Sequence, residues 1–171
     1  MELFQNISLK PYNTFKMDVS AKWFGKFASL NELELILSNT STKIAHPHSP
    51  LIIGGGSNIL FTKNVEGLVL KNEIDGIEKT DETDEHIFIK VGAGVNWHQF
   101  VLYCIEKNYA GIENLSLIPG CVGASPIQNI GAYGVEIKDI FHQLEAYHLQ
   151  DKAVVKFSVG DCAFGYRESI F

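Results

Sequence analysis

The feature that most constrains this chain is a charge-free, glycine-rich segment, IPGCVGASPIQNIGAYG, at residues 118–134. No charged side chain occurs from Asn114 to Val135, yet four glycines and two prolines interrupt the apolar residues of 118–134 far too often for a membrane-spanning helix. Glycine and proline let main-chain N–H and C=O groups come close to a bound object and hold a fixed shape. The segment therefore predicts a ligand-binding loop, with a long structural loop buried between lobes as the alternative.

A second glycine-rich stretch, LIIGGGSNIL, lies at residues 51–60, where an apolar strand runs into three consecutive glycines. Successive glycine N–H groups can point into one hollow and hold phosphate oxygens without a lysine, and Ser57 and Asn58 add side-chain donors. The stretch lacks the GK[ST] ending of a Walker A loop and does not match G-x-G-x-x-G opening a helix. We interpret it as a diphosphate-binding loop, with a tight turn between strands as the alternative.

Composition limits the class of partner. The chain has 171 residues, enough for one substantial core or for two small lobes. Its formal net charge of -6 gives no electrostatic reason to expect nucleic acid or an anionic membrane as a partner. The first residues, MELFQNISLKPYNTF, lack the long apolar core of a secretory signal, so we expect a cytoplasmic protein.

The cysteines and histidines do not predict a metal site. Cys104, Cys121 and Cys162 are odd in number and widely spaced, which favours reduced, mostly buried thiols over a disulfide framework or a zinc site. His46 and His48 flank a proline with no cysteine or acidic cluster nearby in sequence, so we expect an ordinary loop there.

Helix and strand signals are mixed without a regular strand–helix–strand alternation, which predicts the α+β class. One helix is expected at residues 29–39, with a capping box of Ser29 and Glu32, and a second follows the N-cap Asn96 with an apolar stripe over 97–105. Strands are expected in KWFGKFA, PLIIG, GLVLKN and IFIKVGAG, and HQLEAYHL and AVVKFSV form a hairpin around a turn at 150–152. We place a first lobe at about residues 1–72 and a second at about 87–171.

Arg167 is the only arginine in a chain with thirteen lysines. Lysine supplies a plain positive charge, so a lone guanidinium can mark a site that needs a flat, forked donor. Such a donor makes bidentate contacts with a carboxylate, or stabilises negative charge that develops during a reaction. A structural ion pair, for example with the adjacent Glu168, is the alternative.

Together, the two glycine-rich segments favour a dinucleotide with a flat heteroaromatic ring at one end. Main-chain amides of 118–134 would bond the polar edge of the ring, while apolar side chains of the segment pack on its faces. Gln128 and Asn129 carry amides that donate and accept in the same place. We therefore expect residues 54–58 and 118–134 to contact opposite ends of one dinucleotide.

Five stretches of the chain occur in the order seen in the UDP-N-acetylenolpyruvoylglucosamine reductase family, also called UDP-N-acetylmuramate dehydrogenases. These stretches are NTF, GGGSNIL, VGAGVNWHQFV, GIENLSLIPGCVGASPIQNIGAYGVE and FGYRESIF. The resemblance covers nearly the whole chain but only about the first half of such an enzyme. It implies the two-lobed, α+β FAD-binding fold of the p-cresol methylhydroxylase and vanillyl-alcohol oxidase type, formed by residues 1–171, without the C-terminal substrate domain.

The resemblance also implies an activity. In the family, NADPH reduces FAD, and the flavin passes hydride to UDP-N-acetylglucosamine enolpyruvate, giving UDP-N-acetylmuramate for peptidoglycan. Arg167 matches the catalytic arginine that faces the substrate carboxylate, and Tyr133 is a second implied substrate contact. FAD contacts are implied at Gly54, Gly55, Gly56, Ser57, Asn58, Ile59, Leu60, Ile118, Pro119, Gly120, Gly123, Ser125, Pro126, Gln128, Gly131, Ala132, Tyr133 and Gly134.

In the family, a serine proton donor and a glutamate come from the C-terminal substrate domain, and no residues here correspond to them. We therefore expect FAD binding without turnover, since loss of a general acid alone commonly costs about 10²–10⁴-fold in rate. The leading hypothesis is the FAD-binding portion of such a reductase, in a truncated form or as a shortened gene product. The alternatives are a non-catalytic flavin- or nucleotide-binding module that lacks the substrate domain, and a flavin oxidase of the same fold with covalent FAD.

Overall fold

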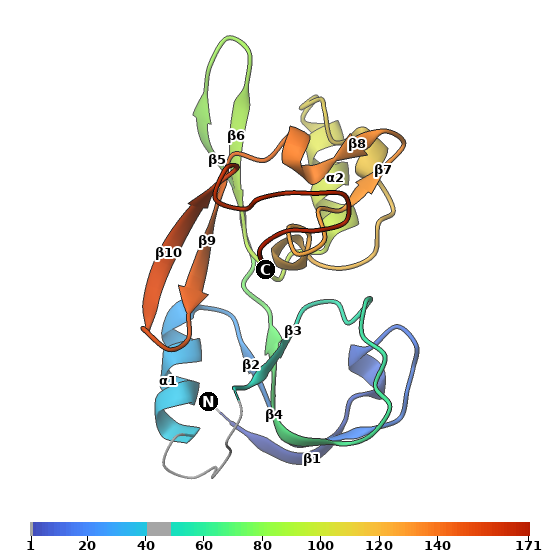
Figure 1. The fold of residues 1–171 in the computed structure, drawn as a ribbon, viewed down its shortest axis with the longest axis vertical. Coiled ribbons are helices and arrows are strands. Elements are labelled where there is room, and N and C mark those ends of the chain that lie inside the picture. The colour runs from blue at the N-terminus through green and yellow to red at the C-terminus, as the bar shows by residue number, and fades with distance from the viewer. Residues whose placement is uncertain (1, 41–48) are drawn as a thin grey trace. The chain divides into compact units, whose positions relative to one another are not determined.

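A computed structural model describes residues 2–40 and 49–171, and the chain divides into two compact units, Met1–Asp75 and Gly76–Phe171 (Figure 1). Each unit has its own cluster of buried apolar residues. Residues 73–86, which the predicted lobes leave unassigned, are divided between the two units. Residues 73–75 belong to the first unit, and the second begins at Gly76, just before the strand Ile77–Glu82. The loop expected around His46 and His48 lies outside the described residues.

The described residues of the first unit form a four-stranded sheet and one α-helix. The strand order is β1-β2-β4-β3, with β1 antiparallel to β2, and with β4 parallel to both β2 and β3. The elements are β1 (Phe4–Ser8), the 3-10 helix η1 (Lys10–Tyr12), β2 (Ser20–Phe27), α1 (Leu30–Thr40), β3 (Leu51–Ile53) and β4 (Val65–Asn72).

Parallel pairing sets the place of the first glycine-rich loop. Ile53, the last residue of β3, lies opposite Lys71, one residue before the end of β4. The loop at 54–58 therefore leaves the sheet at the carboxyl edge of its parallel strands. The core beneath the sheet contains Leu9, Val19, Ala21, Phe24, Ile53, Phe61 and Val69.

The helix expected at 29–39 is confirmed as α1, and its start differs slightly from an ideal capping box. The Glu32 N–H donates to Ser29 Oγ at 3.2 Å, as expected of an N-cap serine. The Glu32 carboxylate, however, accepts from the Ala28 N–H at 2.7 Å rather than from Ser29. The return bond thus reaches one residue further back than the sequence pattern implies.

The second unit consists of one α-helix, short 3-10 turns and separate antiparallel strand pairs. Its cluster of buried residues is built around α2. The elements are β5 (Ile77–Glu82), β6 (Ile87–Val91), α2 (Trp97–Glu106), η2 (Glu113–Leu115), η3 (Val122–Ala124), β7 (Gly131–Ala132), β8 (Val135–Glu136), η4 (Ile137–Asp139), β9 (Gln143–His148) and β10 (Ala153–Ser158).

The helix α2 begins as the sequence predicts. The Gln99 N–H donates to Asn96 Oδ1 at 3.1 Å, so Asn96 is the N-cap. Trp97, Phe100, Val101 and Cys104 are buried as expected, but the prediction was wrong for Ile105, a member of the same stripe, which is 42% exposed. The Trp97 indole donates to the Leu115 carbonyl at 2.8 Å, which joins the helix to the polypeptide entering the glycine-rich segment.

The predicted hairpin is confirmed as β9 and β10, which pair from Gln143 opposite Ser158 to His148 opposite Ala153. Lys152 in the turn has a φ of +52°. The strands β1, β5, β7 and β8 were not predicted. In β5 the sequence IEKTDE is almost entirely exposed, so it lacks the apolar alternation that marks a half-buried strand.

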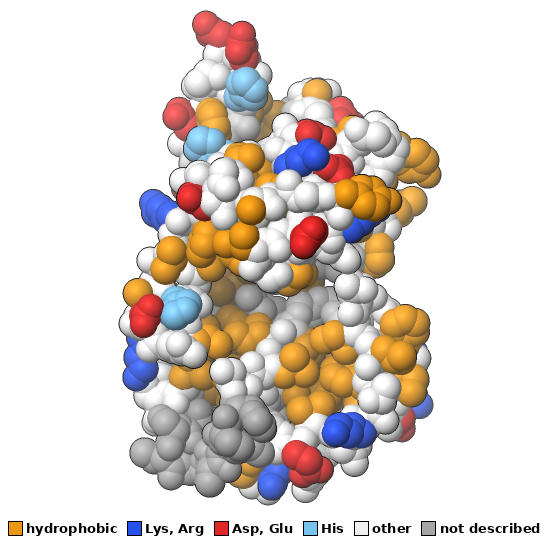
Figure 2. All heavy atoms as spheres, viewed as in Figure 1, with side chains coloured by type: hydrophobic (Ala, Val, Ile, Leu, Met, Phe, Trp, Pro, Cys, Tyr) orange, Lys and Arg blue, Asp and Glu red, His pale blue; other side chains and the backbone are white. Residues whose placement is uncertain are grey.

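The expectation of buried, unpaired thiols is confirmed, because Cys104, Cys121 and Cys162 are all free and buried. No helix in the described part of the chain has the length and apolarity needed to cross a membrane. Large apolar side chains are nevertheless exposed on both units, and Figure 2 shows them as orange areas on the face in view.

Candidate functional site

The loop at residues 54–58 packs against the polypeptide around η1. Gly56 has a φ of +64°, and a Cβ placed on it would lie 2.0 Å from the Tyr12 carbonyl oxygen. The Thr14 N–H donates to the Gly56 carbonyl at 3.1 Å. Only glycine fits this position, because both the backbone conformation and the close approach exclude a side chain.

Asn13 fixes the polypeptide that contacts Gly56. It is 2% exposed, and its Nδ2 donates to the Leu9 carbonyl at 2.8 Å and to the Met17 carbonyl at 3.1 Å. Its Oδ1 accepts from the Met17 N–H at 2.9 Å. The NTF stretch therefore supports the triple-glycine loop. Sequence reasoning missed this role, since nothing at Thr14 signals a partner 42 residues away.

The first part of the 118–134 segment packs against the turn that precedes α2. The Trp97 N–H donates to the Gly120 carbonyl at 3.0 Å, and the Val122 and Gly123 N–H groups donate to the Val95 and Ala93 carbonyls at 2.9 and 3.0 Å. A Cβ on Gly123 would lie 2.6 Å from that of Ala93. Gly123 is therefore required by protein packing, independently of any ligand.

Two buried polar side chains of the segment are bonded within the protein. Ser125 is 3% exposed and its hydroxyl donates to the Val122 carbonyl at 2.6 Å. Asn129 is fully buried, and its Nδ2 donates to the Gly165 carbonyl at 2.8 Å while its Oδ1 accepts from the Lys138 N–H at 3.2 Å. The Asn129 amide was expected to bond a ligand ring. In the structure it bonds Gly165 and Lys138, two separate parts of the second unit.

The end of the segment forms the tight turn between β7 and β8. Tyr133 and Gly134 have φ values of +51° and +81°, the pattern of a type I′ hairpin turn. A tyrosine in this conformation is unusual, because a bulky side chain disfavours positive φ. Tyr133 is also 88% exposed. Its ring is therefore presented to solvent at a strained backbone position.

Arg167 lies on a second tight turn, closed by a hydrogen bond of 2.9 Å from the Gly165 N–H to the Glu168 carbonyl. Its Nη2 donates to the Gly131 carbonyl at 2.7 Å, which joins this turn to the start of β7. No carboxylate among residues 2–40 and 49–171 forms an ion pair with Arg167, so the alternative of a structural pair with Glu168 is not found.

The two turns line an open hollow of about 500 Å³ in the second unit. Of the predicted site residues in this unit, 131–134 and Arg167 lie together here. Tyr166, which the sequence analysis gives no role, also lines the hollow and is 86% exposed. The predicted residues that do not line it are Ile118, Pro119, Gly120, Gly123, Ser125, Pro126 and Gln128.

The chain matches one protein-family model and a set of curated proteins. The model of a family described as "FAD binding domain" matches residues 42–157, more than half of the chain. The chain belongs to this FAD-binding family. Among curated proteins, it is 53% identical over 171 residues to the UDP-N-acetylenolpyruvoylglucosamine reductase of Amoebophilus asiaticus (strain 5a2), covering 100% of the chain and 50% of that protein. The chain spans about half the length of the curated relatives that it matches.

Solved structures support the fold. The UDP-N-acetylenolpyruvylglucosamine reductase (MurB) of Thermus caldophilus matches with a TM-score of 0.75 at 23% identity, over 100% of this chain and 57% of that one. GilR, an oxidoreductase of gilvocarcin biosynthesis, matches with a TM-score of 0.62 at 16% identity, over 92% and 33%. The predicted α+β, FAD-binding fold of the vanillyl-alcohol oxidase type is confirmed.

The triple-glycine loop of this FAD-binding chain fits a diphosphate. In the described structure, the N–H groups of Gly55 and Gly56 donate no hydrogen bond, although Gly56 is buried. Unpaired main-chain donors at the edge of a sheet are the groups that hold phosphate oxygens. Gly54 is half-buried and Gly55 is exposed, so a ligand can reach the loop. Ile59 packs partly on the core of the first unit, while Leu60 is 63% exposed.

The two cationic side chains that line the hollow of the second unit, Lys138 and Arg167, differ in whether a carboxylate neutralises them. Lys138 Nζ lies 2.5 Å from Glu136 Oε2. This contact lowers the pKa of the Glu136 carboxyl and raises the pKa of the Lys138 ammonium group. Within the described chain, Arg167 is thus the cation of this hollow without a carboxylate partner. An anion entering the hollow meets Arg167 as its available positive charge.

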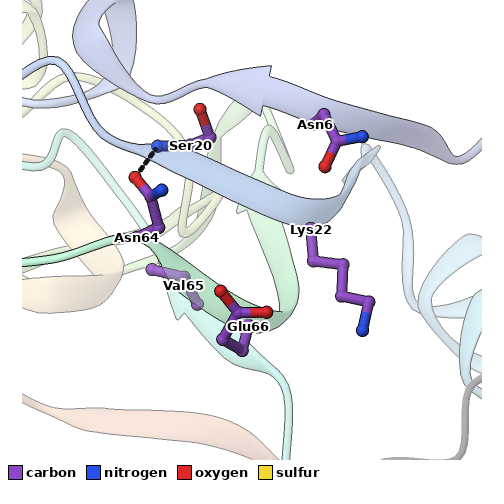
Figure 3. A pocket seen from close by; sticks show the side chains of 6 residues that line it. All are labelled: Asn6, Ser20, Lys22, Asn64, Val65 and Glu66. Atoms are coloured by element: carbon purple, nitrogen blue, oxygen red, sulfur yellow. Dashed lines mark hydrogen bonds between the residues drawn. The ribbon is translucent and has the colours of Figure 1, made fainter.

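A smaller hollow of about 130 Å³ lies in the first unit, lined by Asn6, Ser20, Lys22, Asn64, Val65 and Glu66 (Figure 3). Asn64 Oδ1 accepts from the Ser20 N–H at 2.9 Å across it. Because Ala21 lies opposite Val65, this hollow is at the amino ends of β2 and β4, away from the 54–58 loop. It is not part of the candidate site.

The described residues contain no group of three or more His, Cys, Asp or Glu side chains that could hold a metal ion.

Proposed function

We propose that this chain is the FAD-binding portion of a UDP-N-acetylenolpyruvoylglucosamine reductase. The reaction is reduction of UDP-N-acetylglucosamine enolpyruvate to UDP-N-acetylmuramate with NADPH as reductant, in the cytoplasm. The proposal is supported by membership of the FAD-binding family and by the names of the curated relatives. The observation that carries it is Arg167, which has no carboxylate partner among the described residues, donates to the Gly131 carbonyl, and lines the same hollow as the exposed Tyr133.

The two glycine-rich segments have different parts in this proposal. Residues 54–60 hold the diphosphate of FAD through main-chain N–H groups, with Ser57 and Asn58 adjacent. Residues 118–134 would line the isoalloxazine ring and nearby parts of the cofactor. When bound, FAD supplies the hydride-transfer chemistry. The protein orients it and, through the apolar side chains of the segment, limits access of water.

Arg167 acts on the substrate carboxylate. Hydride addition beside a carboxylate builds negative charge, which a fixed guanidinium stabilises in the transition state. The bond from Nη2 to Gly131 uses one of its five N–H donors, and the others remain for the carboxylate. Tyr133 is the second substrate contact, and its exposed ring offers an apolar face.

FAD binding is tested by titrating the purified chain with FAD and following flavin absorbance and fluorescence. We expect saturable one-to-one binding. Gly55→Asp places a carboxylate beside the diphosphate and should raise the Kd for FAD at least about tenfold, because like charges in contact repel strongly. Gly67→Asp is the matched control, since it adds the same charge to the same unit where a Cβ meets nothing within 4 Å. A native chain that takes up no FAD would contradict the proposal.

The assignment of Arg167 is tested in an enzyme of the length of the curated relatives that carries this chain. Arg167→Ala should lower kcat by about 10²–10³-fold, the typical effect of removing one donor that stabilises developing charge. The Kd for FAD should remain within about twofold of the native value. Equal losses of turnover and of flavin affinity would show that Arg167 supports the cofactor site rather than the substrate.

A further inference from the structure

Residues 127–131 are joined to the C-terminal tail, residues 165–171, by a hydrogen bond at every second residue of the 127–131 segment. The Ser169 hydroxyl donates to the Ile127 carbonyl at 2.8 Å, and Asn129 Nδ2 donates to the Gly165 carbonyl at 2.8 Å. Arg167 Nη2 donates to the Gly131 carbonyl at 2.7 Å. In Figure 1 the tail is the dark red segment of the second unit. The position of Arg167 thus depends on this set of contacts.

Asn129 differs from the other members of the set because it is fully buried, whereas Arg167 is exposed. The hydrogen bond from Asn129 to Gly165 is partly buried and so is partly shielded from competing water, and its loss would leave the Gly165 carbonyl without this partner. Asn129 also has a φ of +41°, a conformation that asparagine tolerates better than most residues. Its Oδ1 is occupied by the Lys138 N–H, which fixes the orientation of the amide.

We propose that Asn129 is a positioning residue for Arg167. By holding Gly165, two residues before Arg167, it keeps the Gly165–Glu168 turn against the segment that ends at Gly131. The guanidinium then meets the Gly131 carbonyl at the hollow instead of sampling solvent. The inference deepens the proposed function and rests on it for the use that the reaction makes of Arg167, but the positioning itself is a property of the chain without cofactor.

The single arginine of the chain makes this testable by NMR. With ¹⁵N-labelled arginine, all guanidinium signals belong to Arg167. In the native, cofactor-free chain we expect resolved Nη signals with slow hydrogen exchange, because the bond to Gly131 restricts rotation of the group. Asn129→Asp keeps the acceptor for Lys138 and removes the donor to Gly165, and Asn129→Gly keeps the backbone conformation. Both variants should merge the Nη signals into one rapidly exchanging signal.

Asn108→Asp is the matched control. Asn108 lies in the same unit with a φ of +58°, is exposed, and its backbone N–H bonds Ile105. The substitution adds the same charge without touching the turn, so the arginine signals should remain as in the native chain. Ser169→Ala removes the contact at the other end of the set and should broaden the Nη signals less than either Asn129 variant.

Resolved native-like arginine signals in a folded Asn129 variant would overturn the inference. If neither variant folds, the coupling between Asn129 and Arg167 is tested in the native chain by hydrogen exchange. Its Asn129 Nδ2–H signals and Arg167 Nη signals should lose protection from exchange together as denaturant is added, and separate loss would contradict the coupling. Failure of FAD to bind the native chain would remove the proposed function and leave this NMR result unaffected, so the two failures are distinguishable.

Discussion

The two glycine-rich segments differ in what their glycines and polar groups are used for. In the 54–58 loop, Gly56 is required by contact with Tyr12, while the N–H groups of Gly55 and Gly56 point to no partner in the described structure. In the 118–134 segment, Gly123 packs against Ala93, and the buried Ser125 and Asn129 are bonded to other parts of the second unit. A glycine-rich composition therefore does not by itself distinguish a loop that faces a ligand from one that packs on the protein.

The largest expected effect is at Gly56. Gly56→Ala combines a positive φ with a Cβ 2.0 Å from the Tyr12 carbonyl oxygen. We expect a loss of roughly 3 kcal/mol or more in the free energy of unfolding of the first unit. The indole N–H signals of Trp23 and Trp97, one in each unit, report the two transitions separately during denaturant titration. Gly67→Ala is the control, and a comparable loss there would remove the special role of Gly56.

Gly123→Ala tests whether packing requires the longer segment's glycines. The new Cβ would crowd Ala93, including its carbonyl oxygen at 3.0 Å, and overpacking of this kind costs about 1–3 kcal/mol. Gly134→Ala is the matched comparison, since its Cβ meets nothing within 4 Å and only its φ of +81° opposes the change, at about 1 kcal/mol. Unfolding of the second unit measures both. A larger loss at Gly134 would reverse this interpretation.

Alkaline pH should lower the free energy of unfolding of the second unit more than that of the first, because all three cysteines lie in the second unit. Burial raises the pKa of the Cys104 thiol to about 11, from an ordinary value near 9. A raised pKa favours the protonated, folded form, so the stability is present below about pH 9 and is lost as pH rises towards 11. We expect a loss of about 1–2 kcal/mol in the second unit. Cys104→Ala should reduce this dependence, and an unchanged pH profile would exclude Cys104 as its source.

The smallest of these effects is expected at Ser125. Removing its hydroxyl in Ser125→Ala deletes the bond to the Val122 carbonyl, which should cost about 1 kcal/mol of stability. If the hydroxyl serves only the loop, the Kd for FAD should change less than twofold. A tenfold weaker Kd with unchanged thermal stability would instead indicate the direct cofactor contact that the family resemblance implies.

Local patterns predicted local structure well. The N-cap at Asn96 and the β9–β10 hairpin follow from short-range signals, and both are present. The role of Asn13 could not be predicted, because its bonds position Tyr12 and Thr14 against a loop more than forty residues away. The same limit applies to Asn129, whose partners Gly165 and Lys138 are brought together only by the folded chain.

The central proposal is that the 54–58 loop and residues 131–134 both take part in FAD binding. Hydrogen exchange of individual amides, measured by NMR with and without saturating FAD, tests it most directly. The account predicts that FAD slows exchange at Gly55 and Gly56 and also within 131–134, with the same dependence on FAD concentration. Protection confined to one of these two segments, or appearing at different FAD concentrations, would contradict it.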